Sequence, residues 1–309
     1  MTIEPVILAL VTVIGAATPL LLAALGETVV EKAGVLNLGI EGMMLVGAVA
    51  AFATAVGTES TVLALLAAAF AGAAMALLFG FLTLSLLTSQ VATGLALTIF
   101  GIGLSALIGA PYVGTPLKRL ARLDIPGLSD LPVAGPLLFS HDILVYAAVA
   151  MVPAIAWFLN KSRAGLILRA VGDSHDAAHA IGYGVIRIRY LAVLFGGMMA
   201  GLGGAYLSLA YTPMWIEQMT AGRGWIALAL VVFAAWRPLR VLIGAYLFGG
   251  VTILQLHAQG GSLIDIPSQY LSMLPYIATI IVLTLMSSGA TRRRLQAPAC
   301  LGRPFHPTA

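Results

Sequence analysis

Most of this chain consists of apolar runs about as long as a membrane is thick, separated by short polar loops. The runs occupy residues 3–25, 43–56, 61–87, 91–110, 143–159, 190–211, 225–236, 241–256 and 270–286. A helix of roughly 20 apolar residues crosses the hydrocarbon core of a bilayer. The chain is 60% hydrophobic and only 9% charged, whereas about a quarter of the residues of a soluble domain are charged. We therefore expect an all-α polytopic membrane protein with about nine transmembrane helices, in a range of roughly eight to ten.

The longest polar interruption lies at residues 160–189 and is rich in arginine and lysine. Each ion would cost roughly 2.5–3.5 kcal/mol inside a bilayer, so this loop must lie outside it. Basic loops favour the cytoplasmic side, as does the run of arginines at 292–294. We expect one transmembrane domain at 1–290, with a loop at about 160–189 that docks a soluble partner. A cytoplasmic tail at 291–309 would follow, so that the C-terminus is cytoplasmic.

Counting spans outward from this loop sets the rest of the topology. Residues 111–140 hold five prolines, which no continuous helix accommodates. The count places this second loop and the N-terminus outside. It also places the glycine-rich stretch at 26–42 inside, at a membrane edge, where a re-entrant segment could form. The glycines of 190–211 predict close helix packing in lipid.

Several classes of protein lack their usual residues here. No phosphate-binding loop and no H-E-x-x-H motif occurs, and Cys300 is the only cysteine. His175 and His179 are spaced four apart without a third ligand, so we expect no metal site. The +4 charge follows from basic loops, so we expect no nucleic-acid binding. No convergent acid, base or nucleophile cluster indicates an enzyme.

Ion-coupled carriers commonly place carboxylates at mid-membrane. The predicted spans are nearly free of ionisable residues, and Glu27, Glu31 and Glu41 fall in the glycine-rich stretch at the expected membrane edge. The energy for uphill transport would therefore come from another chain. An ion- or proton-coupled secondary carrier that works without an ATPase remains the alternative.

Polar side chains near the membrane are candidates for a solute pathway or for capping backbone at a broken helix. They could offer hydrogen bonds to a hydroxylated or heterocyclic solute, and they are Asn37, Glu41, Ser89, Gln90 and Thr93.

Three blocks of sequence resemble one family. Residues 31–45 read E-K-A-G-V-L-N-L-G-I-E-G-M-M-L, residues 169–182 read R-A-V-G-D-S-H-D-A-A-H-A-I-G, and residues 222–229 read G-R-G-W-I-A-L-A. These blocks resemble the signatures of bacterial ABC importer permeases of the nucleoside and simple-sugar type. That group lies within the ribose and branched-chain amino acid permease superfamily.

The resemblance implies a permease subunit in the bacterial cytoplasmic (inner) membrane, which forms the pathway for nucleosides, related purines or simple sugars. It implies an ABC ATPase as partner, with ATP and Mg on that chain and no cofactor on this one. It further implies a second permease subunit, which we expect to be different in sequence, and an extracytoplasmic substrate-binding lipoprotein or protein. The ATPase-coupling residues would be Arg169, Gly172, Asp173, Asp176, Ala177, Ala178 and Gly182.

Overall fold

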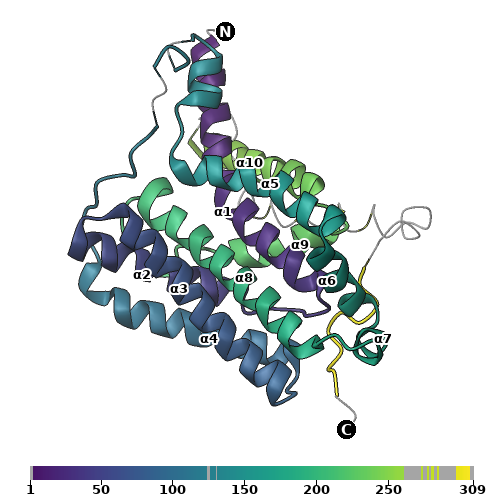
Figure 1. The fold of residues 1–309 in the computed structure, drawn as a ribbon. Coiled ribbons are helices and arrows are strands. Elements are labelled where there is room, and N and C mark those ends of the chain that lie inside the picture. The colour runs from purple at the N-terminus through teal and green to yellow at the C-terminus, as the bar shows by residue number, and fades with distance from the viewer. Residues whose placement is uncertain are drawn as a thin grey trace.

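A computed structural model describes residues 3–123, 126–129, 131–260, 273, 277, 280–281, 284 and 297–306. This part of the chain is helical and contains no β-strand, only two isolated bridges. Figure 1 shows the helices as one bundle. The long helices are α1 (Ile3–Lys32), α2 (Ile40–Thr58), α3 (Thr61–Gly80), α4 (Gln90–Gly109), α5 (Ile143–Lys161), α8 (Val185–Tyr206) and α10 (Pro238–Gly260). The shorter elements are η1 (Phe81–Ser85), η2 (Ala110–Tyr112), η3 (Gly135–Phe139), α6 (Arg163–Asp173), α7 (His175–Ala180), η4 (Leu207–Tyr211) and α9 (Arg223–Phe233).

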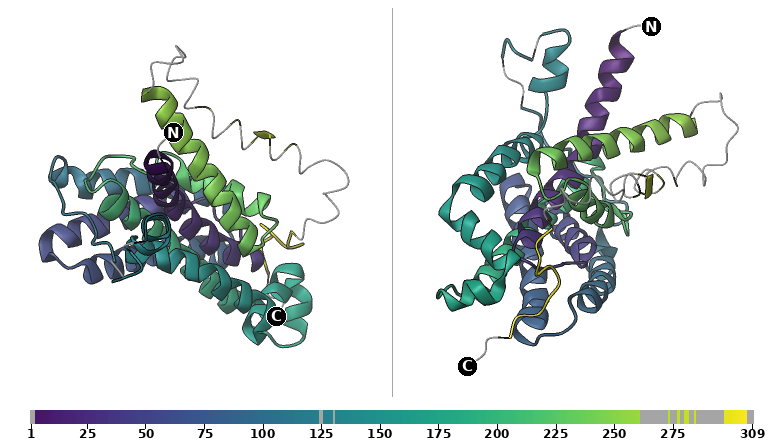
Figure 2. Two further views of the ribbon diagram at one scale, coloured as in Figure 1. Left: turned by 90° about the horizontal axis from the view of Figure 1, so that it is seen from above. Right: turned by 90° about the vertical axis from the view of Figure 1, so that its right-hand side faces the viewer.

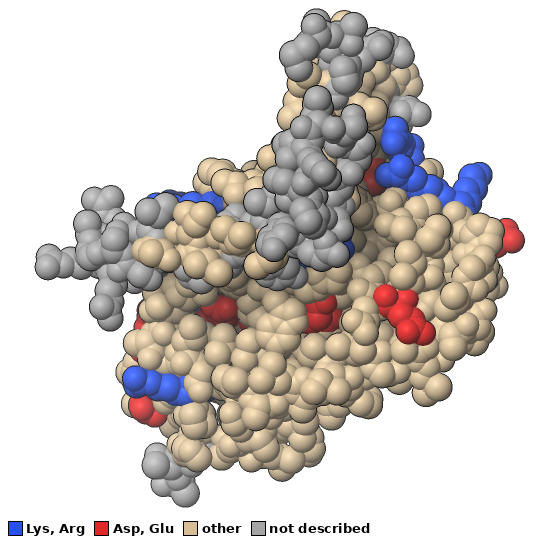
Figure 3. Space-filling view, turned by 180° about the vertical axis from the view of Figure 1, so that it is seen from behind, with Lys and Arg blue, Asp and Glu red and all other residues tan. Residues whose placement is uncertain are grey.

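Seven helices in the described residues are long and apolar enough to cross a membrane. They comprise Val6–Lys32, Ile40–Thr58, Thr61–Ser85, Gln90–Tyr112, Ile143–Lys161, Val185–Tyr211 and Pro238–Ala258. Their outward side chains are apolar, and Phe70, Ile99 and Leu107 are each more than 70% exposed. Such a surface suits lipid rather than water. One face of the described chain is mostly uncharged (Figure 3).

The expected count of about nine spans is not confirmed. The predicted span at 225–236 forms α9, whose 11 residues reach only about 16 Å at 1.5 Å per residue. The predicted span at 270–286 and the arginines at 292–294 fall outside the described residues, apart from single positions within 270–286. The all-helical membrane fold itself is confirmed.

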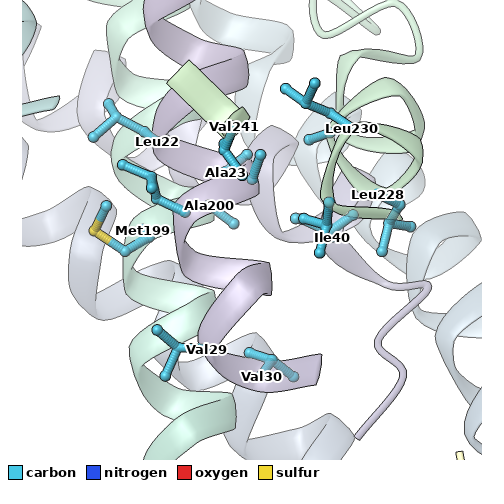
Figure 4. Packing of buried hydrophobic residues seen from close by; sticks show 14 of the residues in the cluster. Leu22, Ala23, Val29, Val30, Ile40, Met199, Ala200, Leu228, Leu230 and Val241 are labelled. Atoms are coloured by element: carbon cyan, nitrogen blue, oxygen red, sulfur yellow. The ribbon is translucent and has the colours of Figure 1, made fainter. Parts of the chain in front are cut away.

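Helix α8 forms the centre of the bundle and packs against α1, α2 and α3 (Figures 1 and 2). Its glycines allow this crowding. A Cβ on Gly197 would lie 2.4 Å from the carbonyl oxygen of Gly72 in α3, and one on Gly204 would meet the carbonyl of Met44 in α2. The expected close packing of this glycine-rich helix is therefore confirmed. Figure 4 shows apolar side chains of α1, α2, α8, α9 and α10 gathered in the core beside it.

The glycine-rich stretch differs from the prediction. Helix α1 continues through Glu27 and Glu31 to Lys32, so the chain does not unwind at Gly26. The break covers residues 33–39 instead, where Gly34 takes a φ of +85°. Apolar packing of the buried Val29 and Val30 favours continuation of the helix here. The proposed re-entrant segment at 26–42 is not confirmed.

The two long polar loops lie at opposite ends of the bundle, separated by α5. At the α7 end, Ser85 Oγ is 2.7 Å from Tyr190 Oη. The backbone N–H of the tail residue Cys300 donates a hydrogen bond to the Gly172 carbonyl oxygen. At the η3 end, Val113 of the 111–142 loop forms an isolated β-bridge with Trp215. The loop at 160–189 and the described tail residues 297–306 thus share one end.

Substituting Gly201 tests the close packing of α8. In Gly201→Ala the new Cβ would lie 2.2 Å from the Ala68 carbonyl oxygen, which is backbone and cannot move freely. We expect a loss of roughly 1–3 kcal/mol in unfolding free energy, as for other overpacked cores. Thermal unfolding of the detergent-solubilised protein would report the change.

The matched control is Gly103→Ala in α4, where a Cβ meets nothing within 4 Å. Equal melting temperatures for the two variants would contradict the role assigned to α8.

Candidate functional site

The three sequence blocks that lie far apart in the chain meet inside the bundle. Block 31–45 forms the end of α1, the break and the start of α2. Gly172 of the second block packs on the end of α1 so closely that a Cβ would lie 2.2 Å from the Lys32 carbonyl oxygen. Gly224 of the third block lies against the backbone of Glu41 in the same way. The first block is therefore the centre to which the other two attach.

Glu41 joins the first and third blocks by hydrogen bonds. Its carboxylate accepts from Thr220 Oγ1 at 2.5 Å, from Gly222 N at 2.8 Å and from Gly224 N at 2.6 Å. The two backbone donors belong to the first turn of α9, whose amides have no partner within the helix. A carboxylate at a helix N-terminus is also favoured by the helix dipole. Glu41 is thus the cap of α9, supplied from another helix.

This contact lies within the bundle, away from its ends. Gly42 packs against Leu97 and Thr98, which lie seven and eight residues into α4. Residues 212–222 have no helical structure, and Thr220, which bonds to Glu41, is fully buried. Glu41 is therefore buried in the bundle at the start of the candidate membrane helix α2, and its position relative to the membrane edge stays a prediction.

Glu27 and Glu31 lie in the last two turns of α1, and both are buried. Glu31 Oε2 accepts from Trp236 Nε1 at 2.5 Å. Glu27 Oε1 accepts from Asn37 N at 3.2 Å, and its enclosed Oε2 has no hydrogen-bond partner. The i, i+4 spacing of the two acids was the signal that could have placed them on one helical face.

The five candidate pathway residues fall into two groups. Asn37 Oδ1 accepts from Gly39 N at 3.0 Å within the break, beside the Glu41 cap described above. The other three lie at the start of α4, at the α7 end. Ser89 caps α4, and Thr93 contacts Thr88.

Gln90 is the member of this set with an unused donor. Its side-chain oxygen accepts from Leu36 N at 2.8 Å, while its enclosed Nε2 has no hydrogen-bond partner. It therefore joins the break to α4 and keeps a donor available beside it.

Helix α7 carries three of the seven predicted coupling residues, Asp176, Ala177 and Ala178, and Gly182 follows it. Ser174 accepts from Ala177 N to begin the helix, and Gly182, at φ +93°, ends it in the left-handed conformation. Asp176 and Ala177 are exposed, whereas Ala178 is buried against the chain's own core.

The remaining coupling candidates lie on α6 and just before α7. Asp173 is exposed, Gly172 is buried, and Arg169 is half-buried with its Nε enclosed and unpartnered. The structure thus brings all seven candidates to one end of the bundle. Only some of them face outward.

No group of three or more histidine, cysteine, aspartate or glutamate side chains in the described residues could hold a metal ion.

Comparison with known proteins gives a consistent result. Residues 9–283 match the family described as branched-chain amino acid transport system / permease component. A putative glucose ABC transporter permease protein of Haloferax volcanii is 41% identical, with 94% of this chain and 95% of that protein covered. The guanosine ABC transporter permease protein NupQ of Bacillus subtilis is 34% identical over 94% and 93% of the two chains. A second guanosine permease protein of that organism, NupP, is 26% identical over 89% and 80%.

Replacing Glu41 by glutamine tests the cap of α9. The two carboxylate oxygens now accept three hydrogen bonds, and the amide would keep one of these oxygens and present an NH2 group in place of the other. Losing one hydrogen bond to a charged group costs roughly 1.5–3 kcal/mol. We expect a lower melting temperature and faster amide hydrogen exchange at residues 220–226.

Glu59→Gln is the matched control, because Glu59 is exposed and lies beyond the other end of the same helix. Unchanged exchange at 220–226 in Glu41→Gln would show that the cap contributes little.

Proposed function

Because this chain belongs to the branched-chain amino acid transport system permease family, we propose that it forms the pathway of an ATP-driven importer of nucleosides, related purines or simple sugars. The chain is a multi-pass membrane protein and an ABC transporter permease subunit, and it is not an enzyme. ATP hydrolysis belongs to a partner ATPase. ATP and Mg would bind there, and this chain would need no cofactor.

The observation that carries the coupling mechanism is the exposed α7. Six residues form a helix fixed at both ends, and its outer side presents Asp176, Ala177 and Ala180, followed by Ile181 at 72% exposure. Small residues let another surface approach closely, and Ile181 offers an apolar contact. We assign this face to docking on the ATPase. Gly172, Ala178 and Gly182 would hold the helix, and Arg169 and Asp173 would flank it.

The solute class follows from the relatives, whose names specify glucose and guanosine. Both solutes carry several hydroxyl groups, which need hydrogen-bond partners in a dry pathway. Gln90, with its unpartnered Nε2, is the proposed contact, and Ser89 and Thr93 lie near it at the start of α4. Asn37 and Glu41 would shape the pathway by holding the broken helices.

The arrangement in the membrane follows from charge. The α7 end carries the basic residues Lys161, Arg163, Arg169, Arg187, Arg237 and Arg240. By the positive-inside rule we assign this end, with the described tail residues, to the cytoplasm, in the bacterial inner membrane. Two guanosine permease proteins in Bacillus subtilis support pairing with a second, different permease. An extracytoplasmic binding lipoprotein or protein would deliver solute to the η3 end.

One observation favours the alternative of an ion- or proton-coupled carrier. Glu27 lies inside a candidate membrane helix with one oxygen unpartnered, which is the kind of group that such carriers use. From the sequence, a carrier was disfavoured because no carboxylate was expected within a membrane span. The structure places Glu27 within a candidate span. Family membership still supports the ATPase-driven mechanism. Uptake by the isolated chain in response to a proton or sodium gradient would establish the carrier instead.

Two substitutions at α7 test its docking to the ATPase: one reverses an exposed charge and the other adds a bulky side chain at the helix end. Asp176→Arg changes an exposed carboxylate, and Gly182→Trp forces a large side chain into a left-handed position. We expect both variants to insert normally but to lose ATPase co-purification and ATP-driven uptake in liposomes.

Glu217→Arg, an equivalent change at an exposed position beyond α8, is the control and should keep the ATPase. Normal uptake in both α7 variants would show that the docking helix is misplaced. Uptake by the wild type that persists without ATP hydrolysis would refute the importer.

Replacing Gln90 tests the pathway. Gln90→Leu removes the free donor at similar size, so we expect an increased KM for uptake with the ATPase still bound. Asn160→Leu, at an exposed amide near the end of α5, is the control. An unchanged KM in Gln90→Leu would remove Gln90 from the pathway.

A further inference from the structure

A chain of polar contacts leads from the exposed face of α7 into the protein. The side chain of Asp176 is 82% exposed, and its Oδ1 lies 3.5 Å from His175 Nε2. On the other side of the imidazole, Arg189 Nη2 lies 3.2 Å from Nδ1. Arg189 Nε then donates to the carbonyl oxygen of Ala33 at 3.2 Å. Ala33 is the first residue after α1, where the break begins.

The chemistry of these groups fixes their roles. A guanidinium can only donate, so His175 Nδ1 accepts from it and the imidazole proton lies on Nε2, facing Asp176. Partial burial, and then the charge of Arg189, lower the pKa of His175. Both effects favour the neutral ring that this arrangement requires.

Arg189 is almost fully buried, with 1% of its surface exposed. A buried guanidinium is costly unless its donors are satisfied. Its third contact is with the carbonyl oxygen of Arg303, at 3.1 Å from Nη1. One side chain on the first turns of α8 thus connects α7, the end of α1 and the C-terminal segment.

Residues 297–306 hold the same three parts together. Cys300 N donates to Gly172 O at 2.9 Å, just before α7, and Gly302 N donates to Gly34 O at 3.1 Å, in the break. The ring of Phe305 lies 5.2 Å from that of His175. Phe305 is buried in a cluster with Val171, Ala178 and Val185.

The break reached by this chain of contacts is the same one that holds the buried polar groups. Three residues beyond Gly34, Asn37 bonds to Glu27, and Glu41 then caps α9. A displacement of Ala33 and Gly34 would therefore act on the interior helices. A direct packed connection of this kind is one physical way to couple distant sites.

We propose that His175 and Arg189, clasped by residues 297–306, transmit movement of α7 to the break between α1 and α2. They are positioning residues for transport, and they act through α7 and the break rather than by touching solute or ATP. This inference rests on the proposed docking of the ATPase on α7.

The first experiment compares three variants in liposomes that contain the ATPase and the binding protein. His175→Leu removes the acceptor for Arg189, and His175→Asn restores an acceptor at the same δ position. His257→Leu, at an exposed histidine of α10, is the control. The readouts are ATPase co-purification, ATP hydrolysis and solute taken up per ATP. We expect His175→Leu to keep the ATPase and its hydrolysis but to lose about fivefold or more in uptake per ATP. His175→Asn should recover most of this loss.

The second experiment separates transmission from simple misfolding. Phe305→Ala removes the ring that packs on His175, and His306→Ala, at an exposed neighbour, is its control. We expect faster amide exchange at 171–183 and lower uptake per ATP in Phe305→Ala, with unchanged exchange in α2.

Unchanged uptake per ATP in both His175→Leu and Phe305→Ala would overturn the inference. Loss of ATPase binding in both would also overturn it, because the contacts would then serve docking instead of transmission. If the docking proposal itself is wrong, the wild type will not retain an ATPase and Asp176→Arg will transport normally. The two failures are therefore distinguishable.

Discussion

The rest of this structure depends on the hydrogen bonds that the start of α9 donates to the carboxylate of Glu41. Two chain segments lack helical structure: 33–39, which is mostly buried, and 212–222, which is buried at Trp215 and Thr220. Backbone groups exposed by such breaks find no water in a membrane and must be satisfied by the protein itself. Glu41 satisfies two amides of α9, and Asn37 satisfies one within its own break. Without these caps the broken helices could not remain at this depth.

The glycines of the sequence blocks follow from the same constraint. A cap from another helix works only if the two backbones approach closely. Gly224 lies against the backbone of Glu41, and Gly172 lies against that of Lys32. In each case a Cβ would overlap main-chain atoms. Gly172 and Gly224 thus mark contacts between blocks, which explains how segments separated by more than a hundred residues form one unit.

This organisation suits a permease that is driven from outside. The rigid part is α8 with its glycine contacts to α1, α2 and α3. The breaks beside it are held by a few polar contacts, which can rearrange at lower cost than a packed helix. Helix α7 lies at the bundle end where the break begins, and Arg189 links the two. A partner acting on α7 would thus reach the interior by a short route.

The sequence alone determined the class of this protein and much of its local structure. Hydropathy predicts membrane helices because lipid requires long apolar runs. The helix at 175–180, the left-handed Gly182 and the close packing of 190–211 follow from local residue chemistry. The family, too, is readable from three short blocks.

Tertiary structure alone decided that Glu27, Glu31 and Glu41 lie inside, that 225–236 is too short to span, and that residues 297–306 fasten α7 to the break. Each of these depends on partners far away in the chain, such as Trp236 for Glu31 and Gly172 for Cys300. Local hydropathy and spacing cannot specify such partners, because they report what a segment can tolerate and not which segment it meets.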